Sequence, residues 1–242
     1  METLRYFHQP TVSESLGNGW YTMKKYFLYL LLAVIITGIF DGGFNIFRYN
    51  FSSHDFTGPW FRHNWDHVFP FAIMFFSVSA LIGLLIAFLV RPVISYGANL
   101  MFLQAARNTR PDIKNLFIGF QRNFLNIILA NILVTIIVIA GFVFLIIPGI
   151  IFACRLFMVS YLVMDKQLNA IDAIETSWRM TRGHGLTIFG LGVMSIFIFI
   201  LGLIVFIIGV FPAMIWINAS FASLYQAIIT ETGAGTVDEE GA

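Results

Sequence analysis

The residue best placed to bind a charged group is Arg155, which lies inside a long apolar segment. It follows Pro148-Gly149 by six residues, or about 9 Å along a helix that rises 1.5 Å per residue. An arginine in hydrocarbon costs a few kcal/mol or more unless it finds a partner or reaches the membrane surface, and its planar guanidinium suits phosphate. We expect Arg155 to meet Asp41, helix carbonyls or an anionic lipid head group.

A second candidate is a set of histidines and an acid in one polar stretch, a combination that could bind zinc. His63 and His67 would share a face if that stretch is helical. The spacing matches none of the specific zinc signatures, and Trp60 and Trp65 favour an aromatic belt at head-group depth or a partner-docking surface. We therefore expect no metal, and the weak candidate ligands are His54, His63, His67 and Asp66.

Motifs of enzymes are missing from the sequence. It contains no Gly-x-Ser-x-Gly, no phosphate-cradling glycine loop and no His-Glu-x-x-His. No acid lies within an apolar segment, which disfavours proton- or sodium-coupled transport. The net charge of +1 gives no basic field for nucleic acid. The sequence therefore predicts a protein that is not an enzyme, uses no cofactor and binds no nucleic acid.

The segments that carry these residues are suited to a lipid environment. The 46 residues from Gly185 to Thr230 carry no formal charge, and neither do the 32 from Asn123 to Cys154. One helix needs only about 20 apolar residues to cross a bilayer. The chain is 58% hydrophobic and 11% charged, against roughly 25% charged residues in soluble domains. It is predicted to be an integral membrane protein.

Six apolar segments can be marked off, and they predict an all-α, polytopic helical bundle made of three membrane hairpins. Turns within the two charge-free runs are expected at the breakers Pro148, Gly149, Gly209 and Pro212. The predicted membrane domain covers 26–230, between a segment at 1–25 and a flexible acidic tail at 231–242. The predicted spans are Tyr26–Phe40, Val68–Val90, Phe124–Ile147, Ile150–Met164, Leu186–Ile208 and Phe211–Ile228.

The distribution of lysine and arginine predicts the orientation. With six spans and the N-terminus inside, eleven basic residues fall on the cytoplasmic side and two, Arg48 and Arg62, fall in the outer segments. Such a bias follows the positive-inside rule. Both termini are therefore expected in the cytoplasm, with an outer loop at 41–67.

The cytoplasmic connections at 91–123 and 165–185 are expected to contain amphipathic helices. Asn169 can cap one of them, whose apolar stripe would include Ile171, Ile174 and Trp178. These helices either pack on the bundle as elbows or lie in the plane of the inner membrane surface and sense lipid. The basic residues placed to meet anionic lipid are Arg107, Arg122, Arg179 and Arg182.

Three strings in order resemble a known family: Leu116-Phe117-Ile118-Gly119-Phe120, Ile146-Ile147-Pro148-Gly149-Ile150, and Ala173 to Trp178 followed by Thr181-Arg182-Gly183-His184. They resemble a widespread bacterial family of six-span membrane proteins of unknown function, similar to the membrane domain of some glycerophosphoryl diester phosphodiesterases. The resemblance covers about 90–228. It implies a helical domain in a bacterial cytoplasmic membrane and supplies no catalytic residues. We do not expect the resemblance to make this chain a phosphodiesterase, since its 242 residues include no such catalytic domain.

The functional expectation is a non-enzymatic membrane module that binds membrane lipids or a protein partner, with Arg155 and the basic connecting helices facing anionic head groups. Possible protein partners are other membrane subunits or a second copy of the chain. The alternative is a small transporter or channel subunit that works as an oligomer. A polar cavity between hairpins would favour transport, and a closed bundle with a lipid-facing groove would favour the module.

Overall fold

The structure is a computed structural model of the 242-residue chain. It describes residues 10–49, 74–75, 77–79, 81–83, 85–204 and 207–232, with side chains except at 40–49, 87, 122 and 207–208. Every regular element in these ranges is a helix. The elements are α1 (Val12–Tyr49), the π-helix η2 (Ile86–Val90), α4 (Arg91–Ala106), the 3-10 helix η3 (Ile113–Leu116), α5 (Ile118–Arg122), α6 (Phe124–Phe144), α7 (Ile146–Leu156), α8 (Val159–Asp165), α9 (Ala170–Met180), α10 (Gly185–Ile204) and α11 (Ile207–Glu231).

Six helical segments within the described ranges are long and apolar enough to cross a membrane. The prediction of an all-α membrane bundle with about six such helices is confirmed. The fourth span ends at Asp165, next to its predicted limit, whereas the first two spans run past the basic residues at which limits were predicted. The six segments are Val12–Ile39, Ser77–Ala106, Phe124–Phe144, Ile146–Asp165, Gly185–Ile204 and Gly209–Glu231.

The first two spans differ most from their predicted limits. Helix α1 begins at Val12 and passes Lys24 and Lys25, with non-helical backbone angles at Tyr26. The second span continues past Arg91 into α4, which was predicted to be a connecting helix that either packs on the bundle or lies in the membrane surface. Eleven of the sixteen residues of α4 are buried, so α4 packs within the bundle. Long basic side chains can extend their charge away from an apolar environment, so they need not mark a helix end.

The turn between α6 and α7 is a single extended residue, Leu145. Pro148 lies in the first turn of α7, where the missing N–H removes no helical hydrogen bond. Gly149 packs under the ring of Phe142, and a Cβ at this position would lie 2.6 Å from that ring. Proline and glycine therefore shape this hairpin just after its turn.

The predicted breakers of the other hairpin are also displaced from its turn. Helix α10 ends at Ile204 and α11 begins at Ile207. Gly209 and Pro212 consequently lie in the first turns of α11 rather than between the two helices. A proline in the first turn of a helix replaces an N–H that has no intrahelical partner, whereas Pro212 is deeper and removes one backbone hydrogen bond.

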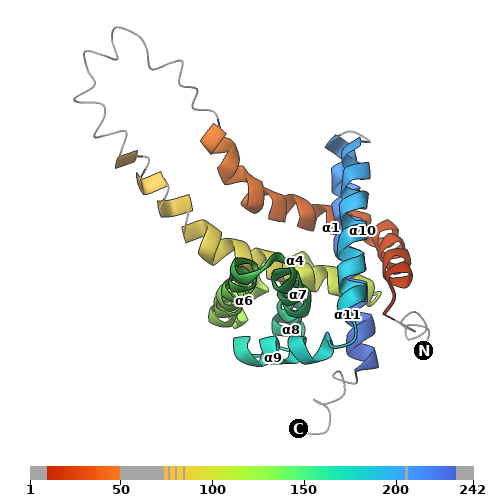
Figure 1. Cartoon of the computed structure of the whole chain (residues 1–242). Coiled ribbons are helices and arrows are strands. Elements are labelled where there is room, and N and C mark those ends of the chain that lie inside the picture. Colours follow the sequence, from red (N-terminus) through yellow and green to blue (C-terminus); the bar gives the residue numbers. More distant parts are fainter. Residues whose placement is uncertain are drawn as a thin grey trace.

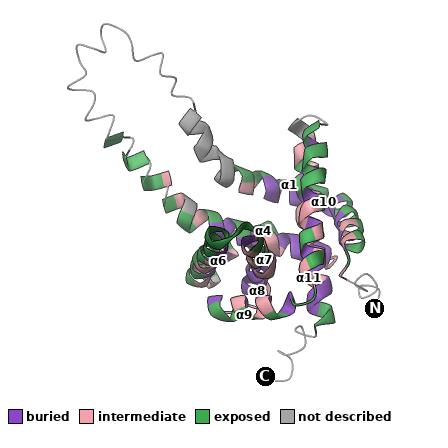
Figure 2. Ribbon diagram, viewed as in Figure 1, coloured by how far each residue is buried: buried purple, intermediate pink, exposed green. Residues whose placement is uncertain are grey.

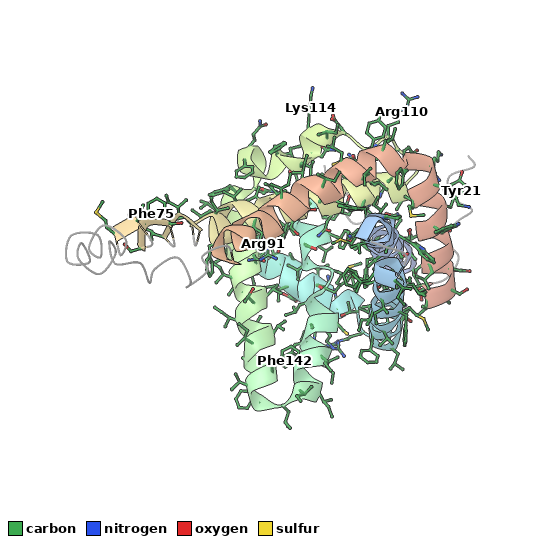
Figure 3. The ribbon with its side chains drawn as sticks, turned by 90° about the horizontal axis from the view of Figure 1, so that it is seen from above. Tyr21, Phe75, Arg91, Arg110, Lys114 and Phe142 are labelled. Carbon is green, nitrogen blue, oxygen red and sulfur yellow. The ribbon has the colours of Figure 1, made fainter. Side chains whose placement is uncertain are left out.

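The hairpins extend from a common base in different directions. In Figure 1 the α10–α11 pair runs down the page, whereas α6 and α7 are seen nearly end-on. In Figure 3, turned by 90°, α6 and α7 run down the page to Phe142 and α10–α11 is seen end-on. The described part of α1 and the segment before α4 extend to a third side (Figure 1).

Buried residues concentrate where the hairpins meet, and exposed residues cover their far ends (Figure 2). Leu30, Leu162 and Leu224 have at most 1% of their surface exposed. At the α6–α7 turn, Phe144 is 81% exposed and Leu145 is 68% exposed. Exposing this much apolar surface to water would cost about 25 cal/mol per Å². The hairpin ends are therefore suited to hydrocarbon.

Candidate functional site

Arg155 lies in the last turn of α7, and its side chain rests on α9. The guanidinium carbon is 4.9 Å from the centre of the Trp178 ring, within the range of a cation–π interaction. Arg155 Nη1 donates a long hydrogen bond of 3.4 Å to the Trp178 carbonyl oxygen. The arginine side chain is half-buried. Both of its described side-chain contacts are made with Trp178 of α9.

Backbone and aromatic contacts fix this arrangement. Ser177 Oγ donates to the Arg155 carbonyl oxygen at 2.7 Å, and Thr181 Oγ1 donates to the same oxygen at 3.4 Å. The rings of Phe152 and Trp178 have centres 5.6 Å apart. These contacts dock helix α9 against the end of α7 and hold the indole in place under the guanidinium.

The buried face of α9 is made of small residues and one methionine, which the sequence analysis did not anticipate. Ala170, Ala173, Ser177 and Met180 are buried, whereas Ile171 of the predicted stripe is 67% exposed. Asn169 precedes the helix as predicted, but its side chain makes no capping hydrogen bond. Close helix packing explains the difference, because small side chains let α9 approach α7 and α8 closely.

Of the three partners expected for Arg155, the structure shows a helix carbonyl. Within the described residues no carboxylate lies within ion-pair distance of its guanidinium. The side chain of Asp41 lies outside the described residues. Guanidinium has five N–H donors, and one long hydrogen bond leaves most of them available to an anion.

Arg107, in contrast, uses three of its five N–H donors in hydrogen bonds within the protein. It follows α4 and makes two hydrogen bonds to Asp165 at the end of α8, from Nη1 at 2.5 Å and from Nη2 at 2.7 Å. Its Nε donates to Gln226 Oε1 of α11 at 2.6 Å, and the Tyr225 hydroxyl donates to Asp165 at 3.0 Å. Arg107 therefore joins three helices and is a poor candidate for lipid binding.

We call Arg107, Asp165, Tyr225 and Gln226 the arginine junction. The residues other than Arg107 were not singled out from the sequence, since they lie 58 to 119 positions away from it. The junction brings together the C-terminal ends of the second, fourth and sixth candidate spans. The one available signal was that an acid at the end of an apolar span needs a partner.

The other predicted basic residues fall into two groups. Arg179 and Arg182 are exposed at the end of α9 and the turn that follows, and neither forms an ion pair with a described residue. The side chain of Arg122 lies outside the described residues. Arg110 and Lys114, not singled out before, project from the side of the molecule opposite Phe142 (Figure 3).

The weak metal candidates lie outside the described residues, all within 50–73. Over the part of the chain that the structure describes, no group of three or more histidine, cysteine, aspartate or glutamate side chains could hold a metal ion. The zinc interpretation of His54, His63, His67 and Asp66 thus stays a weak prediction from sequence.

Comparisons with protein-family models, with curated proteins and with solved structures find no match to this chain. The functional interpretation therefore depends on the side chains described above. The half-buried guanidinium of Arg155 lies over the ring of Trp178. Two further arginines, Arg179 and Arg182, follow Trp178 within four residues of the sequence.

Proposed function

We propose that the protein is a non-enzymatic membrane module that binds anionic lipid head groups at Arg155. The observation that carries the proposal is the guanidinium held over Trp178 with a single long hydrogen bond and no carboxylate among the described residues. A phosphate would accept the free N–H donors in a charge-assisted pair, which is stronger than a neutral hydrogen bond.

The surroundings of Arg155 support this choice of ligand. Arg179 and Arg182 add positive charge on the same short stretch of chain as Trp178. Six apolar helices place the protein in a membrane, where anionic head groups are abundant near basic residues. The indole of Trp178 limits the rotamers of Arg155 before binding, which lowers the entropy lost when the lipid binds.

A substitution series at Arg155 tests the proposal. The purified full chain is titrated with phosphatidylglycerol or with phosphatidylcholine, and retained lipid is counted by native mass spectrometry. Arg155→Gln should weaken phosphatidylglycerol retention by about tenfold, because one charge-assisted hydrogen-bonding partner of the phosphate is lost. Arg155→Lys should also weaken it, because an ammonium lacks the planar fork.

Arg110→Gln is the matched control, since Arg110 is exposed elsewhere on the molecule and has no described aromatic partner. It should leave phosphatidylglycerol retention unchanged. Equal retention by Arg155→Gln and Arg110→Gln would remove the support for a site at Arg155. A thermal melt of each variant shows whether lost binding reflects lost folding.

The family resemblance, a bacterial cytoplasmic membrane and two cytoplasmic termini belong to the same proposal. A transporter or channel subunit is the alternative, and we rank it second because no acid lies within a predicted apolar segment, which disfavours ion-coupled transport. Ion flux through vesicles that contain the purified chain would favour that alternative.

A further inference from the structure

An apolar hollow of about 340 Å³ lies on the surface between α1 and α11. It is lined by Leu16, Gly17, Trp20 and Trp216. Its volume is at the lower end of the range for small-molecule sites in proteins. The hollow is open to the outside, so a bound group would lie along the surface and would not be enclosed.

The two indoles that form its walls are held in place. Trp216 Nε1 donates to the Leu16 carbonyl oxygen at 2.9 Å, and this satisfies the polar atom of that ring. The rings of Trp20 and Trp216 pack edge to face with centres 4.8 Å apart, a favoured geometry for aromatic pairs. Trp20 is nevertheless 42% exposed. These contacts restrain both indoles, so little side-chain freedom would be lost on binding.

The floor of the hollow is a glycine that internal packing does not explain. A Cβ at Gly17 would meet no atom within 4 Å. Gly19 differs, because a Cβ there would lie 2.1 Å from Ser220 Oγ of α11. Glycine inside a helix is about 1 kcal/mol less favourable than alanine, so Gly17 weakens α1 without allowing a closer approach to another helix. Because Gly17 has no side chain, this part of the hollow stays open.

A lysine stands at the edge of this hollow. Lys24 is one helical turn beyond Trp20, and its Nζ lies 4.9 Å from the centre of the Trp20 ring. Lys24 forms no ion pair with a described carboxylate. The neighbouring Lys25 differs, since it donates to Asn108 Oδ1 at 3.0 Å. An apolar hollow bordered by an available cation matches a ligand with an apolar chain and an anionic head.

We propose that this hollow holds an acyl chain of an anionic phospholipid whose phosphate pairs with Lys24. The charge of Lys24 and the apolar walls select this occupant over a cationic or purely polar ligand. The inference deepens the proposed function by adding a second contact for the same class of lipid, but it stands on α1 and α11 and not on Arg155. A second copy of the chain is the competing occupant.

Filling the hollow is the direct test. Gly17→Leu adds a side chain at the hollow, and its Cβ would meet no atom within 4 Å. Gly38→Leu is its matched control, since a Cβ at Gly38 of the same helix also meets nothing within 4 Å. With the purified full chain and native mass spectrometry, Gly17→Leu should lower the retention of both phosphatidylglycerol and phosphatidylcholine, because both carry acyl chains. Gly38→Leu should retain both.

A charge series tests the head-group contact. Lys24→Gln should weaken phosphatidylglycerol retention by about tenfold, as expected for one lost charged hydrogen bond, and should leave phosphatidylcholine unchanged. Lys114→Gln, at an exposed lysine on another element, is the control. Unchanged lipid retention in both Gly17→Leu and Lys24→Gln would overturn the proposal.

Two further outcomes are distinguishable. If Gly17→Leu abolishes a dimer seen by mass and leaves lipid retention intact, a second copy occupies the hollow and the proposal is wrong. If Gly17→Leu loses lipid while Arg155→Gln does not, the hollow stands and the Arg155 site fails. The reverse pattern retains the Arg155 site and rejects the hollow.

Discussion

Arg107 and Asp165 face each other with two parallel hydrogen bonds of 2.5 and 2.7 Å, which tie the end of α4 to the end of α8. Only 8% of the Asp165 side chain is exposed, against 34% of Arg107. A buried carboxylate needs such a partner, because its desolvation would otherwise be costly. The pair is therefore expected to secure the base of the fold and not to bind a ligand.

The first prediction concerns this pair. Asp165→Asn should lower the free energy of unfolding by about 2 kcal/mol, less than the 3–5 kcal/mol typical of a fully buried pair, because Arg107 is partly exposed. Thermal unfolding in detergent measures the change. The double variant Arg107→Met with Asp165→Leu should recover part of the stability, since neither charge is then left alone. A double variant less stable than Asp165→Asn would contradict this account.

The second prediction concerns the tyrosine of the arginine junction. Tyr225→Phe removes the hydroxyl that donates to Asp165 at 3.0 Å, but it keeps the ring stacked on Tyr161 with centres 5.0 Å apart. The expected loss of unfolding free energy is about 1 kcal/mol, the typical net value of one hydrogen bond. Tyr225→Leu, which also removes the stacked ring, should cost more. Equal losses for the two variants would show that the stacked ring contributes nothing, and an unchanged stability of Tyr225→Phe would contradict the role of the hydroxyl.

The third prediction concerns the contact of α1 with α11. Gly19→Ala would place a Cβ 2.7 Å from the Ser220 backbone nitrogen, so the two helices must separate. We expect a destabilisation of about 1–3 kcal/mol, as for other overpacked positions. Gly38→Ala, whose Cβ meets nothing within 4 Å, should instead stabilise α1 slightly by helix propensity. Circular dichroism melts that show the same sign for both variants would refute the close contact.

The fourth prediction concerns Asn108, whose φ of 59° is in the left-handed region. Asn108→Val should destabilise the fold, because a β-branched residue is strained there. Asn108→Gly should cost less, since glycine adopts this φ without strain and still offers the carbonyl that accepts from the Tyr26 hydroxyl at 2.8 Å. Melting temperatures of the two variants measure the difference, and an equal loss would argue against strain.

The fifth prediction concerns topology. Cys154 is the only cysteine, so Cys154→Ser gives a background in which Lys114→Cys and Thr232→Cys can be labelled singly. Both positions are exposed and lie beyond spans whose ends meet at the arginine junction. An impermeant maleimide should therefore reach both from the same face of sealed vesicles. Labelling from opposite faces would exclude a chain with both termini in the cytoplasm.

The fold class could be predicted from the composition, but some helix ends were predicted wrongly because basic residues were taken to mark them. Charge-free runs such as Gly185–Thr230 identify membrane helices because hydrocarbon excludes charge along most of a span. The same rule placed a helix end at Arg91, where the chain continues into the buried helix α4. Whether a basic side chain ends a helix or extends away from it depends on neighbouring helices, which a local sequence does not contain.

The candidate site was only partly predictable, for a similar reason. Arg155 could be singled out because a charge within a span is costly wherever it lies. Its partner Trp178 is 23 residues away, and the sequence analysis had assigned that tryptophan to an apolar stripe. Arg107 and Arg155 look alike in sequence. The structure shows that Asp165 neutralises Arg107, whereas Arg155 has no carboxylate partner among the described residues.

The apolar hollow between α1 and α11 could not be predicted from the sequence. Trp20 and Trp216 are 196 positions apart, and they line one hollow because α1 crosses α11 at Gly19 and Ser220. A glycine in a helix has several explanations in sequence, including close packing, a turn or a vacancy. Only the surrounding atoms separate Gly19, which allows close packing, from Gly17, which leaves space.

The adjacent residues Arg107 and Asn108 form hydrogen bonds to different helices. Arg107 donates to Asp165 of α8 and to Gln226 of α11. Asn108 accepts hydrogen bonds from Lys25 and Tyr26 at the bend of α1. The peptide unit between these two residues therefore carries hydrogen bonds to the first helix at its bend and to the last helix near its end.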